Sequence, residues 1–192
     1  MTNRFSIMII CSLSMIVCLG GCSKKITYGD PRGIETVTVE FGSTDLQKIV
    51  EEMTRSFLNS KVVTSGIGPI VTVQEVNNKT SEYIDTRMIT DSIRTQLSQS
   101  SVVRFVVDEV AMQEAISEIE RQQNSEYYDQ DTATEKGRMV GAAYRLTGNI
   151  ASIVKQNSDT KDVYYKINLQ LWNVQNGLLE WSEETEIRKS RS

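Results

Sequence analysis

The stretch that decides the fold is VYYKINLQL, residues 163–171, close to the C-terminal end of the sequence. Every second residue from Val163 to Leu171 is apolar, which is the period of a β-strand with one buried face. Asn176-Gly177 supplies the residue pair of a two-residue type I′ turn. Because Leu179–Ile187 can then return as the partner strand, the sequence predicts an antiparallel hairpin here.

The residues before this hairpin alternate between helical and extended patterns. Apolar residues three and four apart predict three amphipathic helices: Leu46–Leu58 after a cap at Ser43 or Thr44, a helix from about Asp85 to Leu97, and one from the cap Asp108 to about Gln123. β-Branched runs predict strands at Ile70–Val76, Val102–Val107 and Ala143–Lys155, with a short helix at Thr132–Gly141. This order predicts an α/β fold, with a mixed sheet of about five strands and helices packed on it.

The N-terminal residues form a targeting segment. Arg4 is the single charge among residues 1–21, and an apolar run from Phe5 to Leu19 follows it, which is the outline of a signal peptide. The run, about 15 residues, is shorter than the roughly 20 that a membrane-spanning helix needs. We therefore expect residues 1–21 to be a signal peptide and not part of the fold.

The signal peptide ends in a pattern typical of lipoproteins. Leu19-Gly20-Gly21-Cys22 resembles the lipobox at which lipoprotein signal peptidase cuts, so we expect cleavage between Gly21 and Cys22 and lipidation of Cys22. An ordinary secretory peptide, with Cys22 a bystander thiol, is the alternative. The lipid, palmitate included, would hold the protein on a membrane. Ser23, where an aspartate would signal inner-membrane retention, favours the outer membrane, with the protein facing the periplasm.

The remaining chain is expected to be a short tether, 22–43, and one globular domain, 44–192. The tether contains Pro31 and several glycines, and it reaches at most about 70 Å when extended. Without residues 1–21 the 21 basic residues become 20 against 25 acidic ones, so the net charge changes from −4 to −5. A mildly acidic chain without a basic block argues against nucleic acid and favours a protein partner.

The composition excludes several chemistries. The sequence has no histidine, which removes the usual proton shuttle and the commonest zinc ligand. Cys11 and Cys18 would leave with the signal peptide, so no internal disulfide is expected. Adjacent acids such as Glu183-Glu184 point to different sides of a strand, so they do not form a pair of catalytic carboxylates. We expect no catalytic residue, no metal, no cofactor and no small-molecule substrate.

Two clusters are candidate partner-binding sites. Asn77, Asn78 and Lys79 follow a predicted strand, where asparagines also serve as plain turn formers. Tyr127 and Tyr128 lie in an acidic loop where no periodicity demands core aromatics. Tyrosines are common interface anchors, although covering the end of the sheet explains them equally well.

Trp172 and Trp181 fall on the terminal hairpin. Tryptophans at such positions usually pack under a covering helix, so we expect both in the core. Trp172 is out of phase with the inward-facing residues, however, which leaves the opposite face of the sheet open for it. A sugar-binding pair of tryptophans is the functional alternative.

Residues 71–186 resemble a known family, the LpoB-type outer-membrane lipoproteins that activate penicillin-binding proteins. The resemblance rests on VQEVNNKT at 73–80, GAAY at 141–144 and NGLLEWS at 176–182, in this order, together with the lipobox. It implies a small domain like the N-terminal domain of TolB. It also implies binding to a class A penicillin-binding protein and activation of peptidoglycan synthesis, hence of cell-wall growth.

This chain differs from a known member of the family in the length of the linker between the lipid anchor and the domain. That member crosses the periplasm on a long Pro-rich linker, whereas this chain has 2 prolines and a brief tether. The alternative function is a structural or secretion-related envelope lipoprotein, because curli-secretion lipoproteins have a related α/β domain. A wall-active hydrolase would need two carboxylates facing each other across a cleft.

Overall fold

The computed structural model describes residues 26–66 and 68–192. The predicted signal peptide, its cleavage site at Gly21 and the lipidation site Cys22 lie outside the described residues. The chain divides into two compact units, Met1–Pro31 and Arg32–Ser192. The second unit contains every helix and strand described below.

The second unit is built on a mixed sheet of six strands, in the order β3-β1-β4-β5-β6 with β2 also paired to β4. The three long strands are β4 (Tyr144–Gln156), β5 (Lys161–Asn173) and β6 (Leu179–Arg191), and they are antiparallel neighbours. The short strands are β1 (Ile70–Val73), β2 (Asn77–Lys79) and β3 (Arg104–Phe105), and their pairings are all parallel. The α/β fold with a terminal antiparallel hairpin is thus confirmed.

The first predicted strand is broken in two. Ile70–Val76 was expected to be continuous, but β1 ends at Val73, and β2 begins at Asn77 on the same neighbour, β4. The predicted strand Val102–Val107 shrinks to the two residues of β3. β2 and β3 lie at the edge of the sheet, since each pairs with one neighbouring strand, whereas β1 pairs with both β3 and β4.

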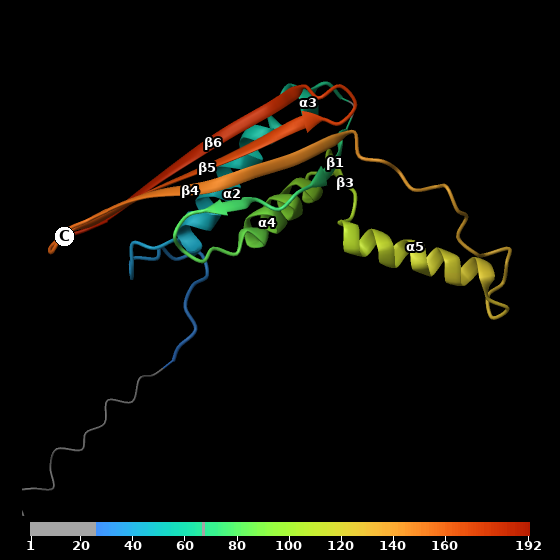
Figure 1. The fold of residues 1–192 in the computed structure, drawn as a ribbon, viewed down its shortest axis with the longest axis horizontal. Helices are drawn as coiled ribbons and strands as arrows, with labels where there is room; N and C mark the ends of the chain where they lie inside the picture. Colours follow the sequence, from blue (N-terminus) through green and yellow to red (C-terminus); the bar gives the residue numbers. More distant parts are fainter. Residues whose placement is uncertain (1–25, 67) are drawn as a thin grey trace, which may run out of the picture. The chain divides into compact units, whose positions relative to one another are not determined.

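Two helices cover one face of the sheet: α2 (Ser43–Leu58) and α4 (Thr86–Gln99) (Figure 1). α2 begins at Ser43, so the cap is Gly42 instead of the expected Ser43 or Thr44, and the Asp45 carboxylate accepts the Gly42 N–H at 2.9 Å. A short helix, α3 (Lys61–Thr64), follows α2. Asp85 caps α4 by accepting the N–H of Arg87 at 3.1 Å.

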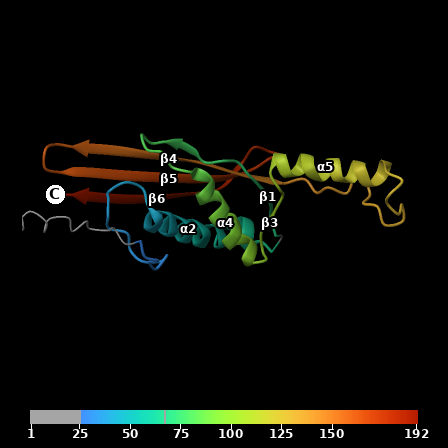
Figure 2. The ribbon, with the colours of Figure 1, turned by 90° about the horizontal axis from the view of Figure 1, so that it is seen from below.

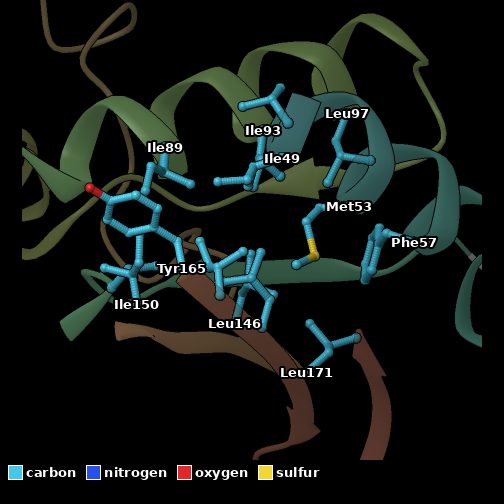
Figure 3. Packing of buried hydrophobic residues seen from close by; sticks show 14 of the residues in the cluster. Ile49, Met53, Phe57, Ile89, Ile93, Leu97, Leu146, Ile150, Tyr165 and Leu171 are labelled. Atoms are coloured by element: carbon cyan, nitrogen blue, oxygen red, sulfur yellow. The ribbon is translucent and has the colours of Figure 1, made fainter. Parts of the chain in front are cut away.

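The core lies between these helices and the long strands (Figure 3). The inward stripes of α2 and α4 meet the alternate apolar residues of β4 and β5, as the sequence pattern predicts. The largest fully buried side chains are Tyr165, Phe57, Ile49, Met53, Ile89, Ile93, Leu97, Ile150, Ile167, Leu169, Leu171 and Val71.

A third long helix, α5 (Glu109–Asn124), begins where predicted but does not join this core. Its cap is Asp108, whose carboxylate accepts the Ala111 N–H at 2.9 Å. No residue of α5 is buried. The predicted short helix Thr132–Gly141 is wrong, because those residues form turns and irregular chain. Two positions there favour a turn: Gly137 has a φ of +79°, and Thr132 Oγ1 donates back to the Asp129 carbonyl.

The terminal hairpin turns through a longer loop than expected. The predicted two-residue turn at Asn176-Gly177 is wrong, because the paired strands end at Trp172 and resume at Leu179. The loop closes with the Asn173 N–H donating to the Leu178 carbonyl at 2.9 Å. Gly177 nevertheless has a φ of +73°, so it does adopt the left-handed conformation that an Asn-Gly turn favours.

The two tryptophans lie on opposite faces of the sheet. Trp181 contacts Phe57 edge to face, and its Nε1 donates to Ser56 Oγ at 3.1 Å, so it packs under α2 as expected. The core expectation for Trp172 is wrong: it pairs with Arg145 on β4, whose guanidinium lies 5.4 Å from its ring centroid. The out-of-phase position in the sequence was the correct indication.

Candidate partner-binding surfaces

The candidate site Asn77–Lys79 forms strand β2, and side-chain hydrogen bonds stabilise the turn that follows it. Asn78 Oδ1 accepts the Thr80 N–H at 2.9 Å and the Thr80 hydroxyl at 2.8 Å, and Asn78 Nδ2 donates to the Glu82 carbonyl at 2.9 Å. Asn77, Asn78 and Lys79 are exposed, and they pair as β2 with Asn149–Ala151 of β4. Asn78 therefore has a structural role, as the turn-forming alternative predicted.

Glu82 connects this loop to the rest of the domain. Its Oε1 accepts the hydroxyl of Tyr165 at 2.5 Å, and its Oε2 accepts the Phe41 N–H at 3.0 Å. Burial and this carboxylate both raise the pKa of Tyr165, so its hydroxyl stays protonated and keeps donating. Tyr83, next to Glu82, is 95% exposed.

Residues of the predicted tether take part in the same junction. Val39 is buried in the core, and the Phe41 ring lies 5.8 Å from the Tyr165 ring, edge to face. Lys161 Nζ is 2.5 Å from Glu40 Oε1, and Lys189 Nζ donates to the Glu40 carbonyl at 2.6 Å. The chain from about residue 35 onward is thus fixed to the end of the sheet where β5 begins and β6 ends.

Tyr127 and Tyr128 differ in their surroundings. Tyr127 is 97% exposed, whereas Tyr128 is 36% exposed and lies beside Arg121, whose guanidinium is 5.9 Å from its ring centroid. Neither tyrosine covers the end of the sheet, because neither packs on the core. The structure does not bring these tyrosines together with Asn77–Lys79, which pair with the middle of β4.

The tyrosines belong to a larger unit that we call the α5 segment, residues Asp108–Ala143, which links β3 to β4. After α5 the chain turns and is held to the helix by two glutamines: Gln123 Nε2 donates to the Thr134 carbonyl at 2.8 Å, and Gln122 Oε1 accepts the Thr134 N–H at 3.0 Å. Ile116, Ile119 and Met139 line a small groove of about 210 Å³ between the helix and the returning chain.

The exposure of this unit was not expected. The pattern of α5 resembles that of α2 and α4, so it predicted packing on the sheet, yet no residue from Asp108 to Ala143 is buried. The sequence does contain an indication that α5 packs less well than α4. Two positions of its apolar stripe, Ala111 and Ala115, are alanines, whereas the stripe of α4 contains isoleucines. Small side chains offer less apolar area to bury.

Among the described residues, no group of three or more Cys, Asp or Glu side chains is placed to hold a metal ion. Among those same residues, no helix is both long and apolar enough to cross a membrane. The charged groups with shifted pKa values are surface pairs. For example, hydrogen bonds from Gln122 and Arg121 lower the pKa of Glu118.

Comparisons with known proteins found a family model and several solved structures that are similar to this chain. A family model described as "Peptidoglycan-synthase activator LpoB" matches residues 45–187. A search of curated proteins found no match. Among solved structures, the LpoB C-terminal domain from Escherichia coli is 20% identical, with 76% of this chain and 99% of that chain covered and a TM-score of 0.47. The same domain from Salmonella enterica is 18% identical with the same coverage and a TM-score of 0.46.

A third solved structure is the lipoprotein GNA1162 from Neisseria meningitidis. It is 16% identical, the match covers 64% of this chain and 83% of that chain, and the TM-score is 0.40.

Proposed function

Because the chain belongs to the LpoB family of peptidoglycan-synthase activators, we propose that it binds a class A penicillin-binding protein and activates it. The observation that carries the proposal is the extent of the family match, residues 45–187, which runs from the first turn of α2 almost to the end of β6. The matched region therefore includes the strands and helices that build the core.

Activation by such a domain requires binding that discriminates between states of the synthase. A ligand shifts an equilibrium only by its difference in affinity for the two states. A tenfold rise in the fraction of active synthase corresponds to about 1.4 kcal/mol of differential binding. A protein surface with a few well-packed anchors supplies this amount readily.

The proposal includes a lipid anchor at Cys22 on the outer membrane. Glu35 is held at the start of α2, since its N–H donates to Thr44 Oγ1 at 2.7 Å and its Oε2 accepts the Ser43 N–H at 2.9 Å. About 12 residues, 23–34, therefore remain between Cys22 and the domain, a span of at most roughly 45 Å at about 3.5 Å per residue. This tether is shorter than the predicted one of 22–43. The partner would have to extend toward the outer membrane to meet the domain.

A polymerisation assay tests the proposal. The full chain, purified in detergent, is added to each class A penicillin-binding protein of the same bacterium, and consumption of a labelled lipid-linked disaccharide-pentapeptide precursor is measured. We expect a faster rate with one synthase, and no turnover when the chain meets the precursor alone. An unchanged rate with every synthase would contradict the proposal and favour the structural or secretion-related alternative.

A further inference from the structure

The α5 segment, Asp108–Ala143, is unusual in how little it buries. All of its residues are exposed or half-buried, and none belongs to the core cluster or packs against it. It exposes several large apolar side chains: 70% of Val110, 97% of Tyr127, 44% of Met139 and 58% of Val140. An isolated helix of this length is marginal in water, so contact with another surface would stabilise it.

Negative charge is concentrated in the same segment. It has a net charge of −6, whereas the whole sequence has −4; the rest of the sequence is therefore slightly basic. Its carboxylates are Asp108, Glu109, Glu114, Glu118, Glu120, Glu126, Asp129, Asp131 and Glu135, and its cations are Arg121, Lys136 and Arg138. Two of these cations are engaged within the segment, because Arg121 pairs with Glu118 and Arg138 pairs with Glu135.

One of the exposed apolar side chains, Val110, shares a surface with several of these charges. Along α5 a shallow groove is lined by Val110 and Ser117 together with the charged residues Glu109, Glu114, Glu118 and Arg121. An apolar centre with a charged rim is the usual organisation of a protein interface. Like-charge repulsion disfavours the pairing of two α5 segments from two copies of this chain, and it also disfavours an anionic membrane surface as the occupant. A protein surface with lysines and arginines around an apolar centre is complementary.

The position of the segment in the fold supports this occupant. The segment leaves the sheet after β3 and rejoins it at β4, where the Ala143 N–H donates to the Ile70 carbonyl. The segment just before α2 attaches at the other end of β4 and β5 (Figure 2), where Lys161 pairs with Glu40. The 13 residues of β4 separate these ends, a length of about 43 Å at roughly 3.3 Å per residue.

We infer that the α5 segment is the docking surface for a basic, apolar-centred face of a protein partner. This inference rests on the proposed function, and the partner that docks on the α5 segment is then the periplasmic part of the synthase. The N-terminal attachment and the docking surface then lie at opposite ends of the sheet. The length of the strands thereby adds to the reach of the short tether.

Charge reversal tests the inference. The full chain in detergent, with the substitutions Glu114→Lys, Glu120→Lys and Glu126→Lys, is compared with a control that carries Glu51→Lys, Glu52→Lys and Asp159→Lys. Both variants change the net charge equally, but the control changes lie on α2 and in the β4–β5 turn. Binding to the full-length synthase is measured at several salt concentrations. Far-UV circular dichroism checks that α5 is retained.

We expect the α5 variant to bind at least about 10-fold more weakly than the parent, and we expect its affinity to depend less on salt, since rim charges act through long-range attraction. The control should stay within about twofold of the parent. Replacing Val110 and Met139 by serine should weaken binding without changing its salt dependence. Hydrogen exchange should show protection of residues 109–143 when the synthase is added.

The outcomes separate the inference from the function on which it rests. If the parent binds and activates a synthase but the α5 variant does so equally well, the inference is overturned and the function stands. If the parent binds no class A synthase, both are overturned. If the α5 variant alters sedimentation of the chain by itself and leaves synthase binding intact, the surface serves self-association and the inference is again overturned.

Discussion

The hydroxyl of Tyr165, in the middle of β5, donates a hydrogen bond of 2.5 Å to the carboxylate of Glu82, in the loop after β2. The other carboxylate oxygen of Glu82 accepts the backbone N–H of Phe41. Three segments far apart in the sequence therefore meet at the carboxylate of Glu82. This junction fixes the place where the N-terminal chain joins the domain.

The first prediction concerns this junction. Tyr165→Phe removes the hydroxyl and leaves Glu82 with one fewer donor, so the free energy of unfolding should fall by about 1.5 kcal/mol or more, the scale for hydrogen bonds to charged groups. Urea denaturation measures the change. The control is Tyr83→Phe, whose side chain is 95% exposed and whose loss should be negligible. If the two variants had the same free energy of unfolding, the hydrogen bond between Tyr165 and Glu82 would not stabilise the fold.

The second prediction is a pH dependence at Glu40. The hydrogen bond from the Lys161 ammonium lowers the pKa of Glu40 from its ordinary 4.5 to about 2. A carboxylate with a lowered pKa in the folded state stabilises the protein above the unfolded pKa, and this contribution disappears as the pH falls toward the folded pKa. The parent should thus be more stable than Glu40→Gln at pH 7.

The difference between these two proteins should shrink below about pH 4.5 and vanish near pH 2. The pair is partly exposed, with 20% of the Lys161 side chain and 44% of the Glu40 side chain accessible, so 1 M salt should also shrink it. Thermal melts over this pH range provide the measurement. A difference independent of pH would mean that the ion pair contributes nothing.

The third prediction concerns the hairpin loop. Gly177 has a φ of +73°, and a β-branched residue resists that conformation, so Gly177→Val should cost at least about 1 kcal/mol of stability. Gly141→Val is the matched control, because no positive φ is recorded there and a Cβ would meet nothing within 4 Å. Melting temperatures should drop for the first variant alone.

The fourth prediction concerns the anchor. Cys22→Ala should abolish lipidation, because the thioether to the lipid requires that thiol. Cells are labelled with a fatty-acid analogue, and the chain is isolated by its affinity tag. Label that persists on the alanine variant would rule out Cys22 as the attachment site. Ser23→Ala, which keeps the cysteine, should retain the label.

The fifth prediction concerns the tyrosines. Replacing Tyr127 and Tyr128 by alanine should weaken synthase binding by roughly 2 kcal/mol, about 30-fold, if they anchor the interface. Tyr83→Ala is the matched control, since Tyr83 is as exposed as Tyr127 but lies beside Glu82, away from the α5 segment. Calorimetric titration against the synthase measures both. Weaker binding by the Tyr83 variant alone would place the interface at the other end of the sheet.

The sequence by itself predicted the elements whose periodicity is strong. The alternation from Val163 to Leu171, the stripe of α2 and the cap Asp108 are local features, because side-chain spacing and capping depend on neighbouring residues alone. The need for glycine at position 177 is local too. The motifs at 73–80, 141–144 and 176–182 are local as well, and they indicate the family that the match over residues 45–187 shows.

Tertiary structure decided where these elements go. The break between β1 and β2 and the loop of the hairpin depend on pairing with β4 and β5, which no local pattern contains. Glu82 became a junction because Tyr165 and Phe41 come to it through the fold. Most of all, α5 has the pattern of a packed helix yet lies outside the core. An amphipathic stripe says that a helix has an apolar face, and only the arrangement of the whole chain decides what covers that face.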